Sequence, residues 1–407
     1  MRALAYYILC WSIVALLVPD GRWWVLAVAV LTTAPLVAFF VRRGWRRYPT
    51  AAFRLFVVRP VLYVQLALPL VSAAGVLGLG IGALVGSPLT GGRIAAAIVL
   101  GVLLVLFVFG YVGSKWLVVR EIQVTVPGLP REFDGLTIAQ ISDLHVGPQT
   151  SQAFLRRITR TVAGLGADII AITGDLVDDR AEDVEAFANG LGSLRAPLGV
   201  YIIPGNHDIY AGWDQVERSL RSRLTATVLV NDAAIVGRGT ARLAIAGTGD
   251  PAGRRAGAGW VGIGTPGTGA PDIERTLVGV PEGVTTIALA HNPALWPALA
   301  ERGVALTLSG HTHWGQFAIP RLGWSLASPF QTRAMGVHRQ GNSMLYIHPG
   351  TGYWGLPFRL GAQPEVTRIT LTTGSEASIT MAPARAMSCG AAPPRQQSAP
   401  RQEPSPA

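Results

Sequence analysis

Five short motifs of this chain combine acidic, amide and imidazole side chains, and each follows an apolar run that predicts a β-strand. Together they hold five of the seven histidines in the sequence. In chain order the motifs are Asp143-Leu144-His145, Gly174-Asp175-Leu176-Val177-Asp178, Gly205-Asn206-His207-Asp208, His291-Asn292 and Gly310-His311-Thr312-His313. Carboxylate, imidazole and amide oxygen suit divalent ions such as manganese, iron or zinc. The set therefore predicts metal-ion chemistry.

Seven of these side chains can bind metal, which is more than one tetrahedral or octahedral ion needs from a protein. The candidate ligands are Asp143, His145, Asp175, Asn206, His291, His311 and His313. Two ions about 3.5–4 Å apart that share a carboxylate can clamp the attacking and leaving oxygens of a phosphoryl centre. They also lower the pKa of a bridging water, which supplies hydroxide at neutral pH. The ligand count thus predicts a two-metal phosphoester hydrolase.

An α/β fold would bring the five motifs together. In open α/β sheets, ligands bind outside the carboxyl ends of the strands, so motifs at successive strand ends converge on one edge. Residues two apart on extended backbone point to the same side, so Asp143 can aim with His145, and His311 with His313. Glycines directly before three of the candidate ligands let the chain turn sharply off the sheet.

Apolar runs alternate with helical stretches after residue 116, which is typical of an α/β fold. Strands are predicted at Ile122–Val126, Leu136–Ile141, Ile169–Ile172, Val200–Ile203, Leu243–Ala246, Thr285–Leu289 and Leu306–Leu308, with later strands around Ser343–Ile347 and Glu365–Leu371. Helices are predicted at Ser151–Leu165, Glu182–Leu191, Asp214–Ser222, Ile273–Leu277 and Pro293–Ala300. The Gly-rich stretch 250–271 predicts a long loop beside the site, although a flexible surface insertion is the simpler interpretation.

In this order, the five motifs resemble those of the calcineurin-like metallophosphoesterase family, and segments 129–147 and 350–371 resemble its membrane-associated bacterial branch. The resemblance covers about residues 121–373 and implies a β-sandwich flanked by helices. It also implies two groups of metal ligands and one bridge: Asp143, His145 and His313 for one ion, Asn206, His291 and His311 for the other, and Asp175 between them.

The resemblance further implies an acid catalyst. His207 would donate a proton to the leaving oxygen and would be held in place by Asp208. A positioned imidazole of this kind typically contributes about 10²–10⁴-fold to the rate. Asp178 is interpreted as a residue that caps or orients its turn and does not bind metal.

One position departs from the family pattern, in which two glycines and a glutamine commonly follow Gly-His-Thr-His. Here Trp314 stands first, and its indole would narrow the site or offer a stacking surface. Tyr353-Trp354-Gly355 falls in a region that the family uses to line the site. Trp324 and Phe330 fit either a core or a contact with the bilayer.

Each motif taken alone has a simpler interpretation. His207 or His291 could be an ordinary loop histidine, and Asp175 could be a turn residue or a helix cap. Five motifs in family order argue against this interpretation for the set. His338 and His348 lie outside the motifs, and no role in the site is predicted for them.

The first 115 residues predict a transmembrane region of about four helices. The runs Trp23–Val41, Val61–Val85 and Ile94–Gly113 contain no charged residue, and each is long enough to cross about 30 Å of hydrocarbon as a helix. Ala3–Val18 is a shorter fourth candidate, which we interpret as a retained helix because no cleavage site follows it.

Charge is distributed unevenly along the chain. The first 120 residues hold 11 basic side chains and one acidic side chain, and so carry the whole formal net charge of +10. The neutral remainder argues against nucleic-acid binding. With four spans, the arginine-rich loop 42–59 lies on the same side as the segment after the last helix. The positive-inside bias places this side, and the catalytic domain with it, in the cytoplasm.

The sequence thus predicts three parts: a transmembrane region over 1–115, a catalytic domain over 116–384, and a disordered tail over 385–407 rich in Pro, Ala, Gln and Ser. We expect a multi-pass protein of the bacterial inner membrane that contacts membrane lipids and acts on a lipid phosphodiester or a lipid-linked pyrophosphate. The alternatives are a hydrolase of a soluble phosphodiester or phosphomonoester, and a non-enzymatic membrane scaffold or sensor. No oligomeric state is predicted.

Overall fold

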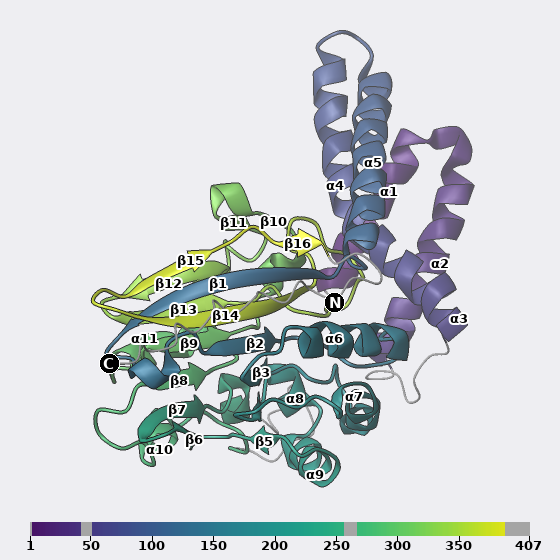
Figure 1. Ribbon diagram of the computed structural model, residues 1–407. Coiled ribbons are helices and arrows are strands. Elements are labelled where there is room, and N and C mark those ends of the chain that lie inside the picture. The colour runs from purple at the N-terminus through teal and green to yellow at the C-terminus, as the bar shows by residue number, and fades with distance from the viewer. Residues whose placement is uncertain (1, 42–50, 256–266, 387–407) are drawn as a thin grey trace, which may run out of the picture.

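The computed structural model describes residues 2–41, 51–255 and 267–386 (Figure 1). Two β-sheets pack face to face after residue 116, and long N-terminal helices stand out from one side of them (Figure 1). Parts of the predicted arginine loop and of the Gly-rich stretch lie outside the described residues. So does the predicted tail, except for β16 (Arg385–Ala386), which pairs with β1 (Val118–Pro127).

The first sheet is built on a parallel centre. Strands β2, β3, β4 and β5 run parallel to one another, because each is joined to the next through a crossover that contains helix. The full order is β15 (Ser378–Met381), β1, β14 (Glu365–Gly374), β2 (Thr137–Ile141), β3 (Ile169–Thr173), β4 (Val200–Ile203) and β5 (Thr227–Val228). Every residue of β2 and of β3 is buried, as expected for parallel strands covered on both faces.

The second sheet has the order β12 (Gly336–Gln340), β13 (Ser343–Ile347), β9 (Leu306–Ser309), β8 (Thr286–Leu289), β7 (Ala241–Gly247) and β6 (Asp232–Arg238). Its inner face meets the first sheet in a core of aliphatic side chains that includes Ile138, Ile245 and Leu308. The predicted β-sandwich is therefore confirmed.

Helices cover the outer faces of the sandwich. The amphipathic helices α6 (Gln152–Gly164), α7 (Val184–Leu191) and α9 (Trp213–Arg223) pack on the first sheet, while α10 (Ile273–Leu277) and α11 (Trp296–Ala300) pack beside the second. All five coincide with predicted helices to within a few residues. A sixth, α8 (Asn206–Tyr210), was not predicted, since its single turn is too short to show a helical period.

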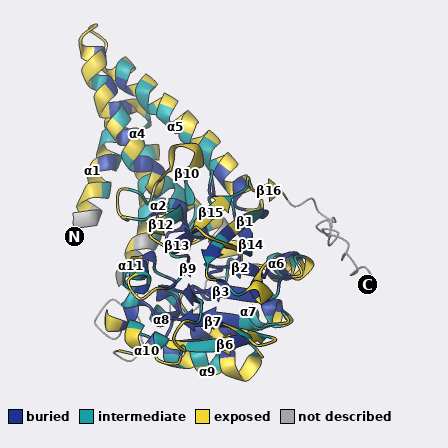
Figure 2. Cartoon of the chain, turned by 60° about the vertical axis from the view of Figure 1, so that its left-hand side comes forward, coloured by how far each residue is buried: buried dark blue, intermediate teal, exposed yellow. Residues whose placement is uncertain are grey.

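The N-terminal region consists of α1 (Arg2–Leu17), α2 (Arg22–Val41), α3 (Ala51–Phe53), α4 (Arg59–Ala83) and α5 (Pro88–Gly113). Helices α4 and α5 pack closely through small residues: a Cβ atom on Gly78 would lie 2.4 Å from the carbonyl oxygen of Gly91. Their outer sides expose apolar side chains, whereas the interior of the sandwich is buried (Figure 2).

Two helical segments are long and apolar enough to span a membrane, residues 56–83 and 88–113. Residues 5–17 and 19–35 satisfy the same criterion only as a pair, which is bent by 116°. By length and composition, the described residues thus offer two spans, or three if the bent pair is one span. The expectation of about four spans stays a prediction.

Candidate metal centre

The candidate ligands all lie at carboxyl ends of parallel strands, where the two sheets share one edge. Asp143 and His145 follow β2, Asp175 follows β3, and Asn206 begins α8 directly after β4. The second sheet supplies the other three: His291 follows β8, and His311 and His313 follow β9. Six of the seven are buried, and His311 is half-buried. The predicted convergence is confirmed, with both sheets contributing.

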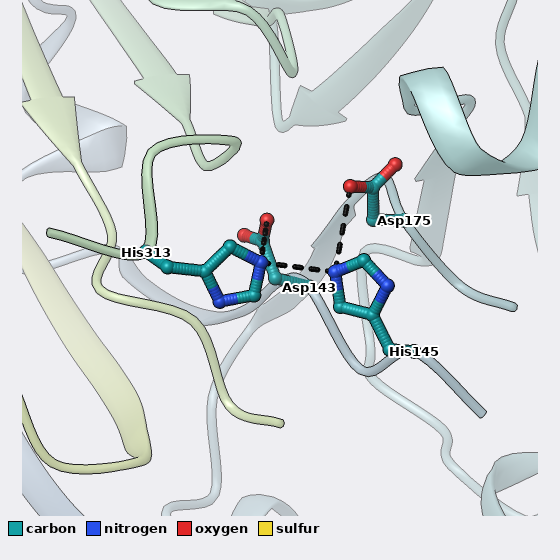
Figure 3. Close-up of side chains that lie close together, drawn as sticks. All are labelled: Asp143, His145, Asp175 and His313. Atoms are coloured by element: carbon teal, nitrogen blue, oxygen red, sulfur yellow. Dashed lines mark hydrogen bonds and ion pairs between the residues drawn. The ribbon is translucent and has the colours of Figure 1, made fainter. Parts of the chain in front are cut away.

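Four of these residues form one group of facing donor atoms, which Figure 3 shows. The Nε2 atoms of His145 and His313 lie 2.9 Å apart. The Nε2 atom of His313 lies 3.2 Å from Oδ1 of Asp143, and that of His145 lies 3.5 Å from Oδ2 of Asp175. These donor atoms converge from three different strand ends.

A second group adjoins the first through Asp175. Its Oδ2 atom, which faces His145, also lies 3.2 Å from Nε2 of His291. The same Nε2 atom lies 3.2 Å from Oδ1 of Asn206, and this oxygen lies 2.7 Å from Nδ1 of His311. One carboxylate oxygen therefore stands between two sets of nitrogen and oxygen donors.

The polar atoms of the site fit divalent cations. Oδ2 of Asp143 is buried and has no hydrogen-bond partner, which is costly for a carboxylate unless a cation satisfies it. Nδ1 of His291 donates to the carbonyl of Thr173 at 2.7 Å, so Nε2 presents its lone pair to the site. Nδ1 of His311 lies 2.7 Å from Oδ1 of Asn206 and is the ring nitrogen that faces the donor group.

Electrostatics within the site are those of a concentrated charge cluster. Burial raises the pKa of Asp175, but the neighbouring imidazoles of His291 and His207 outweigh burial and hold the pKa well below its usual value. Burial lowers the pKa of His311 to about 4. Burial also lowers the pKa of His313, together with the nearby guanidinium of Arg359. The carboxylate of Asp175 outweighs burial at His291 and holds the pKa of that imidazole well above its usual value. Since unprotonated imidazole is the form that binds metal, a cation would displace a proton from His291, whereas His311 and His313 are already neutral.

The backbone at several candidate ligands has a positive φ, a left-handed conformation that residues other than glycine rarely adopt. Five of the seven candidate ligands have positive φ, between 43° and 73°: Asp143, His145, Asp175, His311 and His313. Each such residue costs of order 1–3 kcal/mol, and such residues cluster at functional sites. Backbone hydrogen bonds hold these turns, for example from the amide of His145 to the carbonyl of Asp175 at 3.0 Å.

The glycines that precede three ligands are needed mainly for space. Only Gly174 has a positive φ, of 86°. A Cβ atom on Gly205 would lie 2.2 Å from Oδ1 of Asp175, and one on Gly310 would lie 2.2 Å from Oδ2 of Asp143. The expectation that these glycines serve sharp turns thus holds for one position, while the other two allow the backbone to approach a carboxylate.

His207 lies beside both donor groups. Its ring centroid is 4.6 Å from that of His145, and its backbone amide donates to Oδ1 of Asp175 at 2.8 Å. Nδ1 lies 2.6 Å from the carbonyl oxygen of Asp178. Since a carbonyl oxygen can only accept a hydrogen bond, Nδ1 carries the proton and donates. The other ring nitrogen, Nε2, is therefore the one that can exchange a proton with a substrate.

The predicted contact between Asp208 and the ring of His207 is wrong. Both carboxylate oxygens of Asp208 accept from backbone amides instead, at 2.8 Å from Gly205, 3.0 Å from Leu176 and 3.1 Å from Val177. Asp208 thus ties α8 to the loop that carries Asp175. Sequence proximity suggested the wrong partner, because the first turn of α8 directs the 207 and 208 side chains differently.

Asp178 lies at the edge of the site, as its predicted role in the turn suggests. Its Oδ1 atom is 3.4 Å from Nδ1 of His145 and 3.7 Å from Nδ1 of His207, while its backbone carbonyl holds the His207 ring. These three residues could also hold a cation by geometry. The carbonyl contact favours the orienting role.

Trp314 does not lie where the sequence suggested. Its indole is buried in a core cluster with Trp296 and Ile347, and Nε1 donates to the carbonyl of Ile347 at 2.8 Å. It therefore offers no stacking surface to a substrate, which corrects that expectation. Trp354 does border the site: it is 54% exposed and its ring lies 5.9 Å from that of His207.

One residue of the site was missed by sequence reasoning. Arg359 is fully buried, and its guanidinium contacts Nδ1 of His313 at 2.8 Å, the carbonyl of His313 at 3.1 Å and that of Ala362 at 3.3 Å. It also donates to the carbonyls of Pro349 and Gly352. No motif surrounds Arg359, so only the contact across 46 residues reveals it.

Comparison of the chain with known proteins agrees with this geometry. Residues 136–315 match the Calcineurin-like phosphoesterase family. The chain is 34% identical over 264 residues to "Transmembrane protein with metallophosphoesterase domain" of Danio rerio, covering 62% of this chain and 57% of that protein. It is 31% identical over 261 residues to an uncharacterized metallophosphoesterase of Helicobacter pylori strain J99, covering 64% and 65%.

A third relative is matched along most of its length. The uncharacterized metallophosphoesterase YkuE of Bacillus subtilis is 30% identical over 247 residues, covering 60% of this chain and 81% of that protein. The chain spans less than two thirds of the length of the first two relatives. With the five motifs gathered at one edge of the sandwich and this relative matched so fully, the chain belongs to the calcineurin-like phosphoesterase family.

Proposed function

We propose that the domain hydrolyses phosphoric esters with two divalent ions, which could be manganese, iron or zinc. The observation that carries the proposal is the position of Oδ2 of Asp175, which faces one donor group through His145 and the other through His291. Metal ions bound there would activate water and stabilise charge on a phosphoryl group. Asp143, His145 and His313 would hold one ion, and Asn206, His291 and His311 the other, with Asp175 shared.

The residues around the ligands would direct the proton chemistry. His207 would protonate the leaving oxygen through Nε2, since Nδ1 is engaged by the carbonyl of Asp178. Trp354 would cover one side of the bound ester, given its exposed indole beside His207.

We further propose that the substrate is a lipid phosphodiester or a lipid-linked pyrophosphate. The segment that carries Trp354 packs directly on the apolar helices. The amide of Arg359 donates to the carbonyl of Gly110 in α5 at 2.8 Å, and the hydroxyl of Tyr63 in α4 donates to the carbonyl of Pro357 at 3.1 Å. Residues 354–359, which border the site, therefore pack directly against α4 and α5.

Basic side chains at this junction would attract a phosphorylated headgroup. Nε of Arg59 donates to Oε1 of Gln149 at 2.9 Å, and Nζ of Lys115 lies 5.2 Å from the ring of Tyr353. Arg59 begins α4 and Lys115 follows α5, so both stand where the apolar helices meet the domain. Their positive charge, with that of the arginine loop, supports a cytoplasmic location of the domain at a bacterial inner membrane.

The test uses the full chain in lipid nanodiscs, with Mn²⁺ or with a chelator. Turnover would be measured on a chromogenic phosphodiester, on its monoester counterpart and on a phospholipid diester within the disc. We expect metal-dependent turnover that Asp175→Asn abolishes and that the control His338→Gln, at a histidine outside the site, retains. Equal turnover in chelator would overturn the metal mechanism, and turnover of the soluble diester alone would overturn the lipid assignment.

A further inference from the structure

A short hairpin beside the metal centre exposes an unusual set of apolar side chains. Strands β10 (Ala318–Ile319) and β11 (Trp324–Ser325) form it, and a turn that follows extends it to residue 330. Its exposed apolar residues, with their exposed fractions, are Ile319 (40%), Leu322 (74%), Trp324 (37%), Leu326 (50%) and Phe330 (81%). We call residues 318–330 the apolar hairpin.

Most of the exposed large apolar residues of the domain belong to the apolar hairpin. Nine large apolar residues are exposed in the described part of the domain after residue 115, and five of them belong to the apolar hairpin. Two more, Trp116 and Trp354, lie at the junction with the helices or at the metal centre. Only Ile235 and Val278 lie elsewhere. A soluble domain rarely gathers exposed apolar groups in this way unless they contact something.

The apolar hairpin projects on the same side of the sandwich as α1, α4 and α5, as both views of the chain show (Figures 1 and 2). The segment 359–360 connects the hairpin to α5. The amide of Ala318 donates to the carbonyl of Leu360 at 2.9 Å, and the amide of the preceding residue, Arg359, donates to Gly110 of α5 at 2.8 Å. These two hydrogen bonds restrain the position of the hairpin relative to the C-terminal end of α5.

The chemistry of the hairpin suits a lipid surface better than a protein partner. Between residues 314 and 332 the only charged side chain is Arg321, which is exposed at the turn. Tryptophan, phenylalanine and leucine with one or more arginines are typical of elements that lie in the headgroup region. The apolar surface of α5, which includes Phe109 (61% exposed) and Val112 (54% exposed), continues toward the same junction.

We propose that the apolar hairpin inserts into the headgroup–acyl boundary of the bilayer beside α4 and α5. It follows the metal-ligand motif directly, since only three residues separate His313 from Phe317, which pairs with Leu360. Nε2 of Gln316 also donates to the carbonyl of Trp354 at 3.0 Å. Insertion would hold Gln316 and Trp354, which border the metal centre, next to the lipid surface. The membrane contact itself does not depend on the proposed hydrolysis.

The test places a fluorescent label on the hairpin of the full chain in nanodiscs. Leu322→Cys would carry an environment-sensitive dye, in a background where Cys10 and Cys389 are replaced by serine. The matched control is Val278→Cys, which is 83% exposed and caps the C-terminal end of α10. In both views α10 lies at the end of the domain away from α4 and α5 (Figures 1 and 2). Both sites are exposed, so neither substitution removes core packing.

We expect blue-shifted emission at position 322 and a loss of its intensity when the disc contains spin-labelled phospholipid, with no change at 278. Equal behaviour of the two positions in quenching discs would overturn the proposal. So would emission at 322 that depends on protein concentration and ignores the quencher, because a second copy of the chain would then cover the hairpin. This readout needs no turnover, so it fails or succeeds separately from the proposed function.

Discussion

Substitution of Asp208 by asparagine distinguishes the role seen in the structure from the one that the motif suggested. The carboxylate holds three backbone amides, of Gly205, Leu176 and Val177, and does not contact the ring of His207. Asparagine has the same size but a single acceptor oxygen. That oxygen can serve either Gly205 or the other two amides, so at least one buried N–H would face the NH₂ group of the new side chain.

The magnitude follows from this count. An unsatisfied buried donor costs about 1–3 kcal/mol, and hydrogen bonds to a charged acceptor are stronger than neutral ones. Burial raises the pKa of Asp208 to about 7, so part of the charge is already absent near neutrality. We therefore expect Asp208→Asn to lower the free energy of unfolding by about 2 kcal/mol, which corresponds to roughly 4–8 °C in the melting temperature of a domain of this size.

The assay compares Asp208→Asn with His207→Gln in the full chain, by thermal unfolding, bound metal and turnover. We expect the first variant to melt earlier and to retain less metal, since its loop carries Asp175. His207→Gln should melt like the wild type and keep its metal, while turnover falls about 10²–10⁴-fold. If Asp208→Asn kept stability and metal but lost turnover with an altered pH profile, Asp208 would act on His207, and a purely structural role of Asp208 would be refuted.

Three further predictions follow from buried groups. Arg359→Met should lower the free energy of unfolding by about 3–5 kcal/mol and reduce metal retention, because the guanidinium is buried and holds the His313 turn. The control Arg339→Met breaks an exposed ion pair with Glu376 and should cost less than about 1 kcal/mol in the same thermal-unfolding assay. Burial raises the pKa of Asp250 to about 6, so its neutral form is favoured in the fold, and in metal-free protein this group should contribute a fall in stability of about 3 kcal/mol as the pH rises from 4 to above 6. Asp250→Asn should reduce the fall measured in the wild type by that amount, and an unchanged pH dependence of unfolding would contradict the prediction. Chelation should lower the melting temperature of the wild type but not of Asp175→Asn, since a ligand at 100 times its Kd stabilises by about 2.7 kcal/mol; equal shifts in the two proteins would place the metal elsewhere.

Much of the fold was predictable because its central strands are buried on both faces. Continuous apolar runs such as Ile169–Ile172 and Val200–Ile203 mark β3 and β4 without help from tertiary structure. The edge strands were missed for the opposite reason. In β6 the residues are mostly half-buried or exposed, so composition does not separate the strand from a loop. The parallel order then followed from the alternation of strands and helices.

The position of the candidate ligands at one edge was predictable for a related reason: each belongs to a local motif at a strand end. What could not be predicted depends on contacts between distant segments or on where one helical turn points a side chain. Arg359 reaches His313 across the site, and Trp314 turns into the core to donate to Ile347. Asp208 reaches back to the preceding strand end. Sequence spacing gives the type of chemistry here, whereas side-chain direction decides which neighbour each group serves.

The strained backbone of the turns that carry the candidate ligands also links the site to the apolar N-terminal helices. Five ligands sit at positive φ, which is stable only where the surrounding contacts over-determine the backbone. Arg359 supplies part of that restraint through its guanidinium at the His313 turn, while its own backbone amide donates to Gly110 of α5. A Cβ atom on Gly110 would lie 2.1 Å from the ring of Phe358, so this end of α5 packs tightly against the segment 357–359 and leaves no room for a larger residue at position 110. The apolar helices thus help to support the candidate metal ligands, and a domain without them would lose one of the contacts that hold Arg359 in place.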